Sequence, residues 1–359
     1  MSVDRFLVTG GAGFIGSAFV RRAVHEGHHV LNLDKLTYAG SLRSLAEISE
    51  NRVYEHVRGD ICDRPLVRAL LARFQPTAIV HLAAESHVDR SIDEPAAFIE
   101  TNVVGTFALL AEAVDYWRTL SVNGASRFRF VHVSTDEVFG SLGPAGRFDE
   151  QSPHQPNSPY AASKAGADHL ARAWFHTYGL PVVTTNCTNN YGPYQFPEKL
   201  IPLVILRALA DRPLPVYGSG SNVRDWLFVD DHVAALMLAA RAGRPGETYA
   251  VGGGAERSNL DVVRELCRAV DELAPSGQVP DRTRLIEFVA DRPGHDFRYA
   301  IDSTKIAREL GWRPRESFAS GIERTVAWYL ANRAWCEAVQ ETAGYVGERL
   351  GGTMTGRSP

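Results

Sequence analysis

The chain has 359 residues, of which 45% are hydrophobic and 22% charged, and its formal net charge at pH 7 is −4. This composition is typical of an ordinary globular protein, and the length favours one large domain with a smaller one. The small net charge excludes a global field that would recruit nucleic acid or an anionic membrane, so any phosphate binding must be local.

The four cysteines, Cys62, Cys187, Cys267 and Cys336, are far apart and form no CxxC pair. We therefore expect buried thiols in a reducing compartment, with no metal site. The N-terminus leads directly into a predicted strand, without a charged leader and an apolar run, and no stretch approaches about 18 uninterrupted apolar residues. We expect a cytoplasmic protein without a membrane partner.

A glycine-rich turn follows the first predicted strand. Phe6-Leu7-Val8 is a short apolar run, followed by Gly10, Gly13 and Gly16, and a periodic apolar helix over 14–24 begins within this glycine-rich stretch. In a strand–turn–helix setting, such glycines let backbone amides approach a pyrophosphate at the positive end of the helix. The alternative is a tight turn that binds nothing. We predict a dinucleotide site here.

The next two predicted strands end in acidic residues. The strand over 28–33 ends at Asp34, where a carboxylate accepts hydrogen bonds from a ribose and repels a 2′-phosphate, which favours NAD over NADP. The neighbouring Lys35 softens that preference. A third strand ends at Asp60, whose side chain either meets the adenine edge or serves as an N-cap for the helix from Asp63 onward.

Further strands and helices alternate along the first half of the chain. An apolar run over 78–82 is followed by small residues over 83–86, which leave room for a ligand at the end of a strand. A long helix over 95–117 precedes a fifth strand over 128–133, and this alternation predicts an α/β fold with a doubly wound parallel, Rossmann-type sheet. Asn102, in that helix, is either a polar tie between packed helices or a catalytic residue.

The fifth strand runs into Thr135, Asp136 and Glu137, and a later helix opens with Tyr160 and Lys164, which share one face. Beside NAD, the lysine stabilises a phenolate and lowers the tyrosine pKa, and the phenolate takes the proton of an alcohol while hydride leaves the same carbon. The two carboxyl groups can divide acid and base roles on the neighbouring carbon. A solvated pair that begins a loop is the alternative.

Together these motifs resemble the extended short-chain dehydrogenases and, more narrowly, the dTDP-glucose 4,6-dehydratases. The resemblance rests on residues 9–16, 83–91, 134–138 and the Tyr160-x-x-x-Lys164 pair. It continues through 189–193, 196–202, 224–226 and 291–296, and so spans the chain to about residue 330. Phe297 stands where the family usually has arginine, which removes a positive charge close to His295.

The resemblance implies a lyase that dehydrates a nucleotide-diphosphate sugar. Tyr160 takes the 4-hydroxyl proton while hydride passes from carbon 4 to NAD, Glu137 removes the carbon 5 proton, and Asp136 protonates the departing 6-hydroxyl. Hydride then returns to carbon 6, which gives the 4-keto-6-deoxy sugar. Thr135 contacts the sugar hydroxyl being oxidised.

The resemblance also implies two sets of binding residues. The residues expected to hold NAD are Gly10, Gly13, Phe14, Ile15, Gly16, Asp34, Lys35, Leu36, Thr37, Asp60, Ile61, Leu82, Ala83, Ala84, Ser86, Thr101, Tyr160, Lys164 and Asn190. Those expected to hold the substrate are Ser86, Thr135, Asn189, Lys199, Leu200, Pro215, Val216, Tyr217, Arg224, Asn259, Asp291, Arg292 and His295. Arg224 and Arg292 offer planar forks for a diphosphate, or pair with a neighbouring carboxylate.

We expect an NAD-binding domain over 1–187, to which segments at about 225–255 return, a nucleotide-sugar-binding domain over 188–335, and a tail over 336–359 that frays from Gly351. By analogy with the fold, the helices over 95–117 and 160–178 pack against their copies in a homodimer. Two other functions stay open. A 4-epimerase or decarboxylase needs Tyr160 and Lys164 but not the acid–base pair, and a non-catalytic NAD-sensing regulator tends to lose all of these groups.

Overall fold

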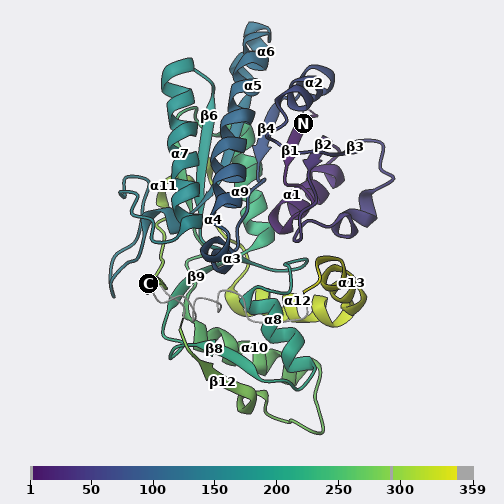
Figure 1. Ribbon diagram of the computed structural model, residues 1–359, viewed down its shortest axis with the longest axis vertical. Helices are drawn as coiled ribbons and strands as arrows, with labels where there is room; N and C mark the ends of the chain where they lie inside the picture. Colours follow the sequence, from purple (N-terminus) through teal and green to yellow (C-terminus); the bar gives the residue numbers. More distant parts are fainter. Residues whose placement is uncertain (1–2, 292–293, 346–359) are drawn as a thin grey trace.

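The computed structural model describes residues 3–291 and 294–345 and consists of a larger body, at the top of Figure 1, and a smaller body below it. The larger body is built on a seven-stranded sheet in the order β10-β6-β5-β4-β1-β2-β3, and every pairing in it is parallel. The α/β doubly wound sheet predicted from the sequence is therefore confirmed. Its strands are β1 (Arg5–Thr9), β2 (His29–Asp34), β3 (Tyr54–Arg58), β4 (Ala78–His81), β5 (Arg129–Thr135), β6 (Val182–Cys187) and β10 (Thr248–Val251).

Helices cover both faces of this sheet, because alternate strand residues point to opposite sides and both sides are apolar. Phe6 and Val8 of β1 belong to a core formed with α1 (Phe14–His25) and α9 (Val229–Ala242). Leu7, between them, belongs to a second core on the other face. The helices on that second face are α2 (Arg64–Phe74), α5 (Thr106–Arg118) and α7 (Pro159–Tyr178).

The order of the strands reverses between β1 and β4. From β1 the chain proceeds outward to β2 and β3, and then returns to β4 and continues outward in the other direction. Ligands of open α/β sheets bind in the crevice that opens at the carboxyl ends of the strands at such a point. The candidate residues after β1, β4 and β5 therefore converge on one place.

The long helix expected over 95–117 is a continuous helical run from Pro95 to Arg118 with an irregular middle. It consists of α4 (Pro95–Phe98), a π-helical segment, η2 (Ile99–Gly105), and α5. By length and composition this run is apolar enough to cross a membrane, but 61% of its apolar window is buried inside the molecule, against α2 and α7 among others. A core helix has the same properties.

The smaller body contains two short sheets and a separate apolar core. One sheet joins β7 (Asn189–Tyr191), β9 (Val223–Phe228) and β11 (Glu256–Ser258), and the other joins β8 (Leu214–Tyr217) and β12 (Ile286–Val289). The helices packed on this core are α8 (Leu200–Leu209), α10 (Asn259–Leu273), α12 (Phe318–Ala331) and α13 (Arg333–Ala343). The remaining elements are η1 (Leu42–Ile48), α3 (Val88–Asp93), α6 (Val122–Arg127), η3 (Asp136–Phe139), η4 (Arg282–Leu285) and α11 (Thr304–Leu310).

The chain passes between the two bodies more than once. After β9 it forms α9 and β10, and β10 pairs with β6 at the edge of the large sheet. The expected tail from 336 begins inside α13, where Cys336 is buried in the core of the smaller body. The frayed segment expected from Gly351 lies outside the described residues.

Candidate active site

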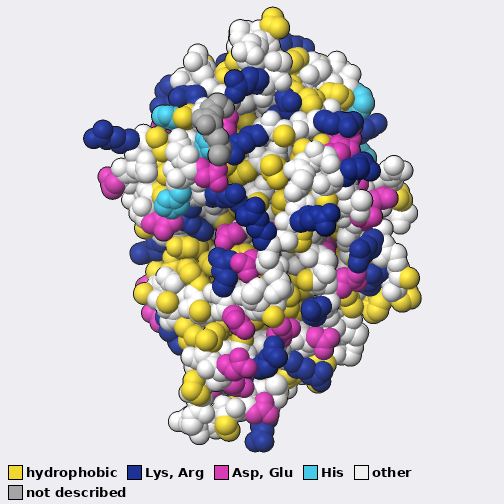
Figure 2. Space-filling model, turned by 180° about the vertical axis from the view of Figure 1, so that it is seen from behind, with side chains coloured by type: hydrophobic (Ala, Val, Ile, Leu, Met, Phe, Trp, Pro, Cys, Tyr) yellow, Lys and Arg dark blue, Asp and Glu magenta, His cyan; other side chains and the backbone are white. Residues whose placement is uncertain are grey.

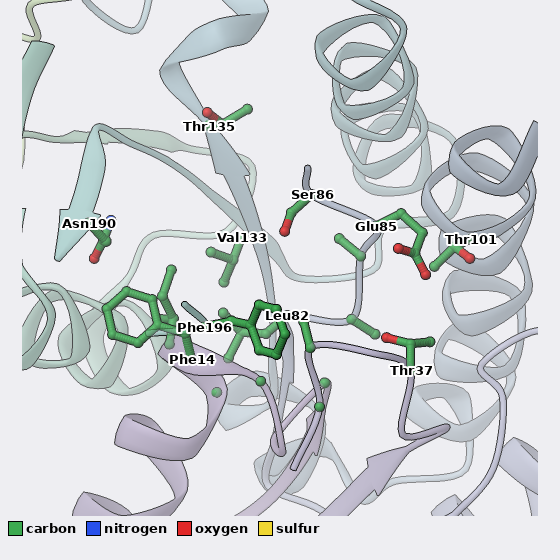
Figure 3. A pocket seen from close by; sticks show the side chains of 18 of the residues that line it. Phe14, Thr37, Leu82, Glu85, Ser86, Thr101, Val133, Thr135, Asn190 and Phe196 are labelled. Atoms are coloured by element: carbon green, nitrogen blue, oxygen red, sulfur yellow. The ribbon is translucent and has the colours of Figure 1, made fainter. Parts of the chain in front are cut away.

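A cavity of about 310 Å³ lies at the carboxyl ends of the strands, between the two bodies. Figure 3 shows side chains from separate elements around it, among them Phe14 of α1, Val133 of β5, Asn190 of β7 and Phe196. All five predicted catalytic residues, Thr135, Asp136, Glu137, Tyr160 and Lys164, line this cavity. The predicted cofactor residues also line it, with the exception of Leu36.

The glycine turn brings backbone unusually close to backbone. Gly10 has φ +72°, and a Cβ on it would lie 2.6 Å from the amide nitrogen of Ala83. A Cβ on Gly16 would lie 2.1 Å from the carbonyl oxygen of Gly10. Gly13 caps α1 without a side-chain hydrogen bond, so the amides of the first turn remain available to a ligand at the positive end of the helix. The turn therefore fits a pyrophosphate.

Two backbone hydrogen bonds fix the Asp34 carboxylate at the position where it could accept hydrogen bonds from a ribose. One carboxylate oxygen accepts a hydrogen bond from the Ala12 amide at 2.9 Å, and the other accepts one from the Leu36 amide at 2.8 Å. Each oxygen keeps a further lone pair for a ribose hydroxyl. Asp34 and the glycine turn together fit one half of a dinucleotide.

The two interpretations of Asp60 can now be separated. Asp63 is the N-cap of α2, since its side chain accepts from the Leu66 amide. Asp60 instead accepts from the Cys62 amide at 2.9 Å and lies 3.5 Å from Lys35 Nζ on the cavity wall. The capping alternative for Asp60 is therefore wrong.

Asn102 ties three parts of the larger body together. Its side chain is buried, accepts a hydrogen bond from the Glu85 amide at 2.9 Å, and donates to the Glu85 carbonyl at 2.9 Å and to Ser163 Oγ at 2.9 Å. The residue lies in the π-helical segment η2, a kind of irregularity that often marks a functional site. The structure shows the polar tie that one interpretation predicted, and this tie fixes the loop after β4.

Tyr160 and Lys164 lie at the buried start of α7. Ser158 caps this helix by accepting from the Ala161 amide, and Pro159 occupies its first turn. Burial raises the pKa of Tyr160 well above its ordinary value, and the charge of Glu137 raises it further. The Lys164 ammonium donates to the Val133 carbonyl at 2.8 Å. The lowered tyrosine pKa expected from the sequence is thus not found, because burial dominates.

Asp136 and Glu137 are the first residues of η3, directly after β5. Asp136 is only 1% exposed, and one of its oxygens accepts from Thr135 Oγ1 at 3.4 Å. Burial, followed by the neighbouring charge of Glu137, raises the pKa of Asp136 to about 8. Asp136 is therefore protonated at neutral pH and can donate a proton. The alternative of a solvated pair at the start of a loop is wrong.

The predicted substrate residues divide into two groups. Ser86, Asn189 and Lys199 line the cavity, and Lys199 Nζ donates to the Ser86 carbonyl at 3.2 Å. Arg224 lies beyond this wall, where it donates to the carbonyls of Val223 and Asp296. Also beyond the wall, in the smaller body, are Leu200, Pro215, Val216, Tyr217, Asn259, Asp291 and His295, whereas Arg292 lies outside the described residues.

Several lining residues were missed by the sequence analysis, and Glu198 is the clearest case. Its buried carboxylate accepts from Tyr38 Oη at 2.9 Å and from Arg90 Nη2 at 3.2 Å, and the Arg90 guanidinium lies 3.8 Å over the Tyr38 ring. These partners come from distant parts of the sequence, so no local pattern could reveal the cluster. The other lining residues that were missed include Glu85, Cys187, Gln195 and Phe196.

A tyrosine and a lysine one helical turn apart, facing the cavity of a doubly wound sheet, define a short-chain dehydrogenase, and the second body places it in the extended branch of that class. The sequence profile of the GDP-mannose 4,6 dehydratase family matches residues 7–325. The chain therefore belongs to this family of nucleotide-sugar 4,6-dehydratases.

Individual relatives agree with this assignment. A probable dTDP-glucose 4,6-dehydratase of Sinorhizobium fredii is 58% identical over 97% of this chain and 98% of its own. The crystal structure of DesIV, a dTDP-glucose 4,6-dehydratase of Streptomyces venezuelae with NAD bound, has a TM-score of 0.85 and 49% identity over 93% of this chain and 99% of its own. The UDP-glucose 4-epimerase of Thermus thermophilus, also with NAD, has a TM-score of 0.79 and 30% identity over 91% and 99%.

Proposed function

We propose that the protein converts dTDP-glucose to dTDP-4-keto-6-deoxyglucose through bound NAD, as a hydro-lyase of deoxysugar biosynthesis. The observation that carries this proposal is the buried, protonated Asp136 beside Glu137, in the cavity that also contains Tyr160 and the glycine turn. A simple alcohol dehydrogenase needs the tyrosine but has no use for the pair. The relatives with the highest identities quoted above are named for this reaction.

Bound NAD would supply the group that takes a hydride from carbon 4 of the hexose and returns it at carbon 6. Tyr160 takes the proton of the 4-hydroxyl, which Thr135 holds. This step requires the pKa of Tyr160 to fall below the raised value that it has in the free chain. Glu137 removes the proton on carbon 5, which the adjacent ketone has made acidic, and later gives a proton back to this carbon. Asp136 gives its proton to the 6-hydroxyl, which leaves as water.

Two binding assignments belong to this proposal. We infer that Ser86, Asn189 and Lys199 contact the substrate, because they line the cavity and Lys199 Nζ donates to the Ser86 carbonyl. The outer residues, Arg224 foremost, serve the nucleotide diphosphate. NAD occupies the glycine turn and the groove along Asp34, where the buried carboxylate disfavours a 2′-phosphate.

The experiment that tests the proposal is product analysis. Purified protein is incubated separately with dTDP-, UDP- and GDP-hexoses, and the products are weighed by mass spectrometry. We expect loss of one water from dTDP-glucose. A product that keeps its 6-hydroxyl would show an epimerase instead, and an NAD-binding protein that leaves all three hexoses unchanged would show a regulator.

We further propose a homodimer formed by the helical run Pro95–Arg118 and α7. Ile99, Val104 and Phe107 are 48%, 39% and 41% exposed, which is high for large apolar side chains on a core helix. Phe107 contacts Trp174 of α7 at 5.8 Å between ring centroids, and Trp174 in turn contacts Tyr178. This apolar band crosses both helices, and a second copy is the partner that the symmetry of most oligomers favours.

The remaining surface and the cysteines support a cytoplasmic enzyme that acts on small molecules. Figure 2 shows basic and acidic side chains interspersed over one face of the molecule, in keeping with the small net charge. The four cysteines are free thiols, three of them buried, as is usual in a reducing compartment.

A further inference from the structure

Lys164 is buried, and burial destabilises the charged form of its side chain. Its side chain lies on the buried face of α7, and its ammonium donates to the Val133 carbonyl at 2.8 Å. A carbonyl dipole does not neutralise an ammonium, and an isolated buried cation tends to lose its proton. A neutral lysine could not stabilise a phenolate on Tyr160. Some group must therefore keep this lysine charged.

Asp168 lies one helical turn after Lys164 on the same face of α7, and its carboxylate is held rigidly. His132 Nε2 of β5 donates to one oxygen at 2.9 Å, and Asn186 Nδ2 of β6 donates to the other at 3.1 Å. Asn186 also donates to the Thr135 carbonyl at 3.1 Å. Asp168 is 6% exposed, so it is an anion fixed behind the catalytic end of β5.

The ionisation of Asp168 follows from these contacts. Burial acts to raise the pKa of this carboxyl group, but the hydrogen bond and charge of His132, with the charge of Lys164, outweigh burial and keep the pKa below its usual value. Asp168 is therefore negative at neutral pH, whereas Asp136, equally buried, is not. The two acids differ because only Asp168 has strong donors on both oxygens.

We infer that Asp168 is a positioning residue for the dehydratase reaction: it is the fixed counter-charge that keeps Lys164 protonated in the cavity that Tyr160 also lines. This inference rests on the proposed function only for its effect on turnover. Its physical content, the charge of Lys164, can be measured without substrate.

The other ionisable groups around Lys164 do not supply this counter-charge. Burial lowers the pKa of Lys164 below its ordinary value, and of the groups that act against burial Asp168 is the first and Cys187 the second. Burial raises the pKa of the Cys187 thiol to about 12, so this thiol is neutral under working conditions. The ionisable groups near Lys164 and Asp168 include His81, His132, Asp136, Glu137, His154 and Cys187, with Tyr160, His169 and Arg172 on α7 itself.

A second cavity, of about 300 Å³, reaches Asp168 from the side away from the dinucleotide. His154, His169 and Arg172 line it, and His154 Nε2 lies 4.0 Å from Asp168 Oδ2. None of these three residues lines the first cavity. A small molecule can therefore reach the position of this carboxylate without competing for the active site.

The direct test measures the charge of Lys164 by NMR. The chain has only four lysines, Lys35, Lys164, Lys199 and Lys305, so 13Cε-labelled lysine gives four signals that Lys→Arg variants assign. In Asp168→Asn, we expect the Lys164 titration to move to lower pH by about one unit or more, since a buried ammonium loses its counter-charge. An unchanged titration in this variant, or a neutral Lys164 at pH 7 in the unmodified protein, would overturn the inference.

The matched control is Glu112→Gln. Glu112 is another buried carboxylate, paired with Arg64 at 2.7 Å and Arg68 at 2.8 Å, between α2 and α5. Its loss removes a buried anion of the same kind far from Lys164. We expect the Lys164 signal of this variant to titrate as in the unmodified protein, and an equal shift in both variants would overturn a specific role for Asp168.

Turnover provides the second readout, through rescue by a small acid. Asp168→Ala leaves a gap that opens into the second cavity, so we expect kcat to fall at least about tenfold at pH 8, with KM little changed, and to recover in acetate but not in acetamide. A purely structural tie would lower kcat without this difference between acetate and acetamide, and that result would contradict the inference. If the unmodified protein fails to dehydrate any hexose, the proposed function falls while the NMR result still decides the role of Asp168.

Discussion

At the scale of single residues, Asp136 and Glu137 are adjacent in sequence but differ in their burial. Asp136 is buried behind Thr135, whereas its neighbour Glu137 is half-buried and faces the same cavity. The sequence predicted both as catalytic because adjacent carboxyl groups at the end of a strand suit paired proton transfers. It could not predict that burial would raise the pKa of Asp136 to about 8, since this depends on contacts made by the smaller body.

Replacement of the proposed base should stop the reaction halfway. In Glu137→Gln, oxidation at carbon 4 still proceeds through Tyr160, but the carbon 5 proton has no acceptor. We expect the absorbance of reduced nicotinamide to build up on the enzyme after substrate is added, with turnover reduced by about 10²–10⁴-fold. Full turnover in this variant would contradict the assigned base, and Glu100→Gln, at an exposed position, serves as the control.

The raised pKa of Asp136 predicts a particular dependence of stability on pH. Between the unfolded carboxyl pKa of about 4 and the native value, the native state holds a proton that the unfolded state has released, so stability falls as pH rises. Asp136→Asn removes this contribution, so the free energy of unfolding should fall less between pH 5 and pH 8 than in the unmodified protein, by about 1.4 kcal/mol for each pKa unit involved.

Urea denaturation at pH 5 and pH 8 measures the two free energies of unfolding for this comparison. The exposed Asp115→Asn should keep the slope of the unmodified protein. The enzymatic consequence has the same sign, because a general acid works only while it is protonated. We expect kcat to decline as pH rises above about 8.

Asp168, unlike Asp136 and Glu137, could not be predicted from the sequence. Asp168 follows Lys164 by one helical turn, and the apolar spacing of this helix does not distinguish Asp168 from other polar residues. Its partners His132 and Asn186 come from two separate strands. Only the parallel pairing of β5 with β6 brings these side chains together. Such a cluster has no local signature.

At the scale of secondary structure, the glycine turn was the most predictable element. The run of glycines between an apolar strand and a periodic helix has one structural solution, in which α1 begins directly over the end of β1. The structure shows which glycines are required sterically. A Cβ on Gly16 would meet backbone at 2.1 Å, whereas one on Gly13 would meet backbone at 3.3 Å.

We expect Gly16→Ala to lower the free energy of unfolding of the free chain by about 2–4 kcal/mol and to abolish NAD binding, because the carbonyl of Gly10 cannot move aside without breaking the turn. Gly13→Ala should cost less than about 1 kcal/mol, since a shift of a few tenths of an ångström relieves its contact. Thermal and urea denaturation measure both variants. If Gly16→Ala and Gly13→Ala lost equal free energy of unfolding, the close approach at Gly16 would not be the cause.

The π-helical segment η2 could not be predicted from the sequence. The apolar spacing over 95–117 indicated one regular helix, and the wider π-helical turn is stabilised by the bonds of Asn102 to the loop after β4 and to Ser163 of α7. Helical period is a local property, whereas this irregularity is stabilised by partners in two other elements. In the sequence, the polar Asn102 among apolar residues was the one sign of this irregular segment.

At the scale of the whole molecule, the exposed band on the run Pro95–Arg118 leads to a prediction about assembly. Phe107→Glu places a charge in the proposed dimer contact, so we expect the protein to sediment as a monomer at concentrations where the unmodified chain is a dimer. Phe288→Glu, on β12 of the smaller body, replaces an equally large side chain that is 57% exposed and should leave the mass unchanged. Identical masses for all three proteins would contradict this interface.

The arrangement of the two bodies was only partly predictable. We expected segments at about 225–255 to return to the large sheet, and β10 does pair with β6, whereas β9 belongs to the smaller sheet with β7 and β11. The contacts that join the bodies at the cavity were not foreseen, because Glu198 meets Tyr38 and Arg90 across long separations in sequence. These charged and aromatic contacts depend on the packing of complete domains.

The return of the chain to its first sheet has a consequence for biosynthesis. Until the ribosome has delivered β10, strand β6 remains an uncovered sheet edge, and until α9 follows β9, the apolar face under it stays open to solvent. Domains usually fold as units while they emerge, but this one must wait for residues made after part of its neighbour. A nascent chain stalled before residue 229 therefore exposes apolar surface, and a cofactor-binding fragment needs every residue through β10, although β7, β8 and β9 of the smaller body come first in the chain.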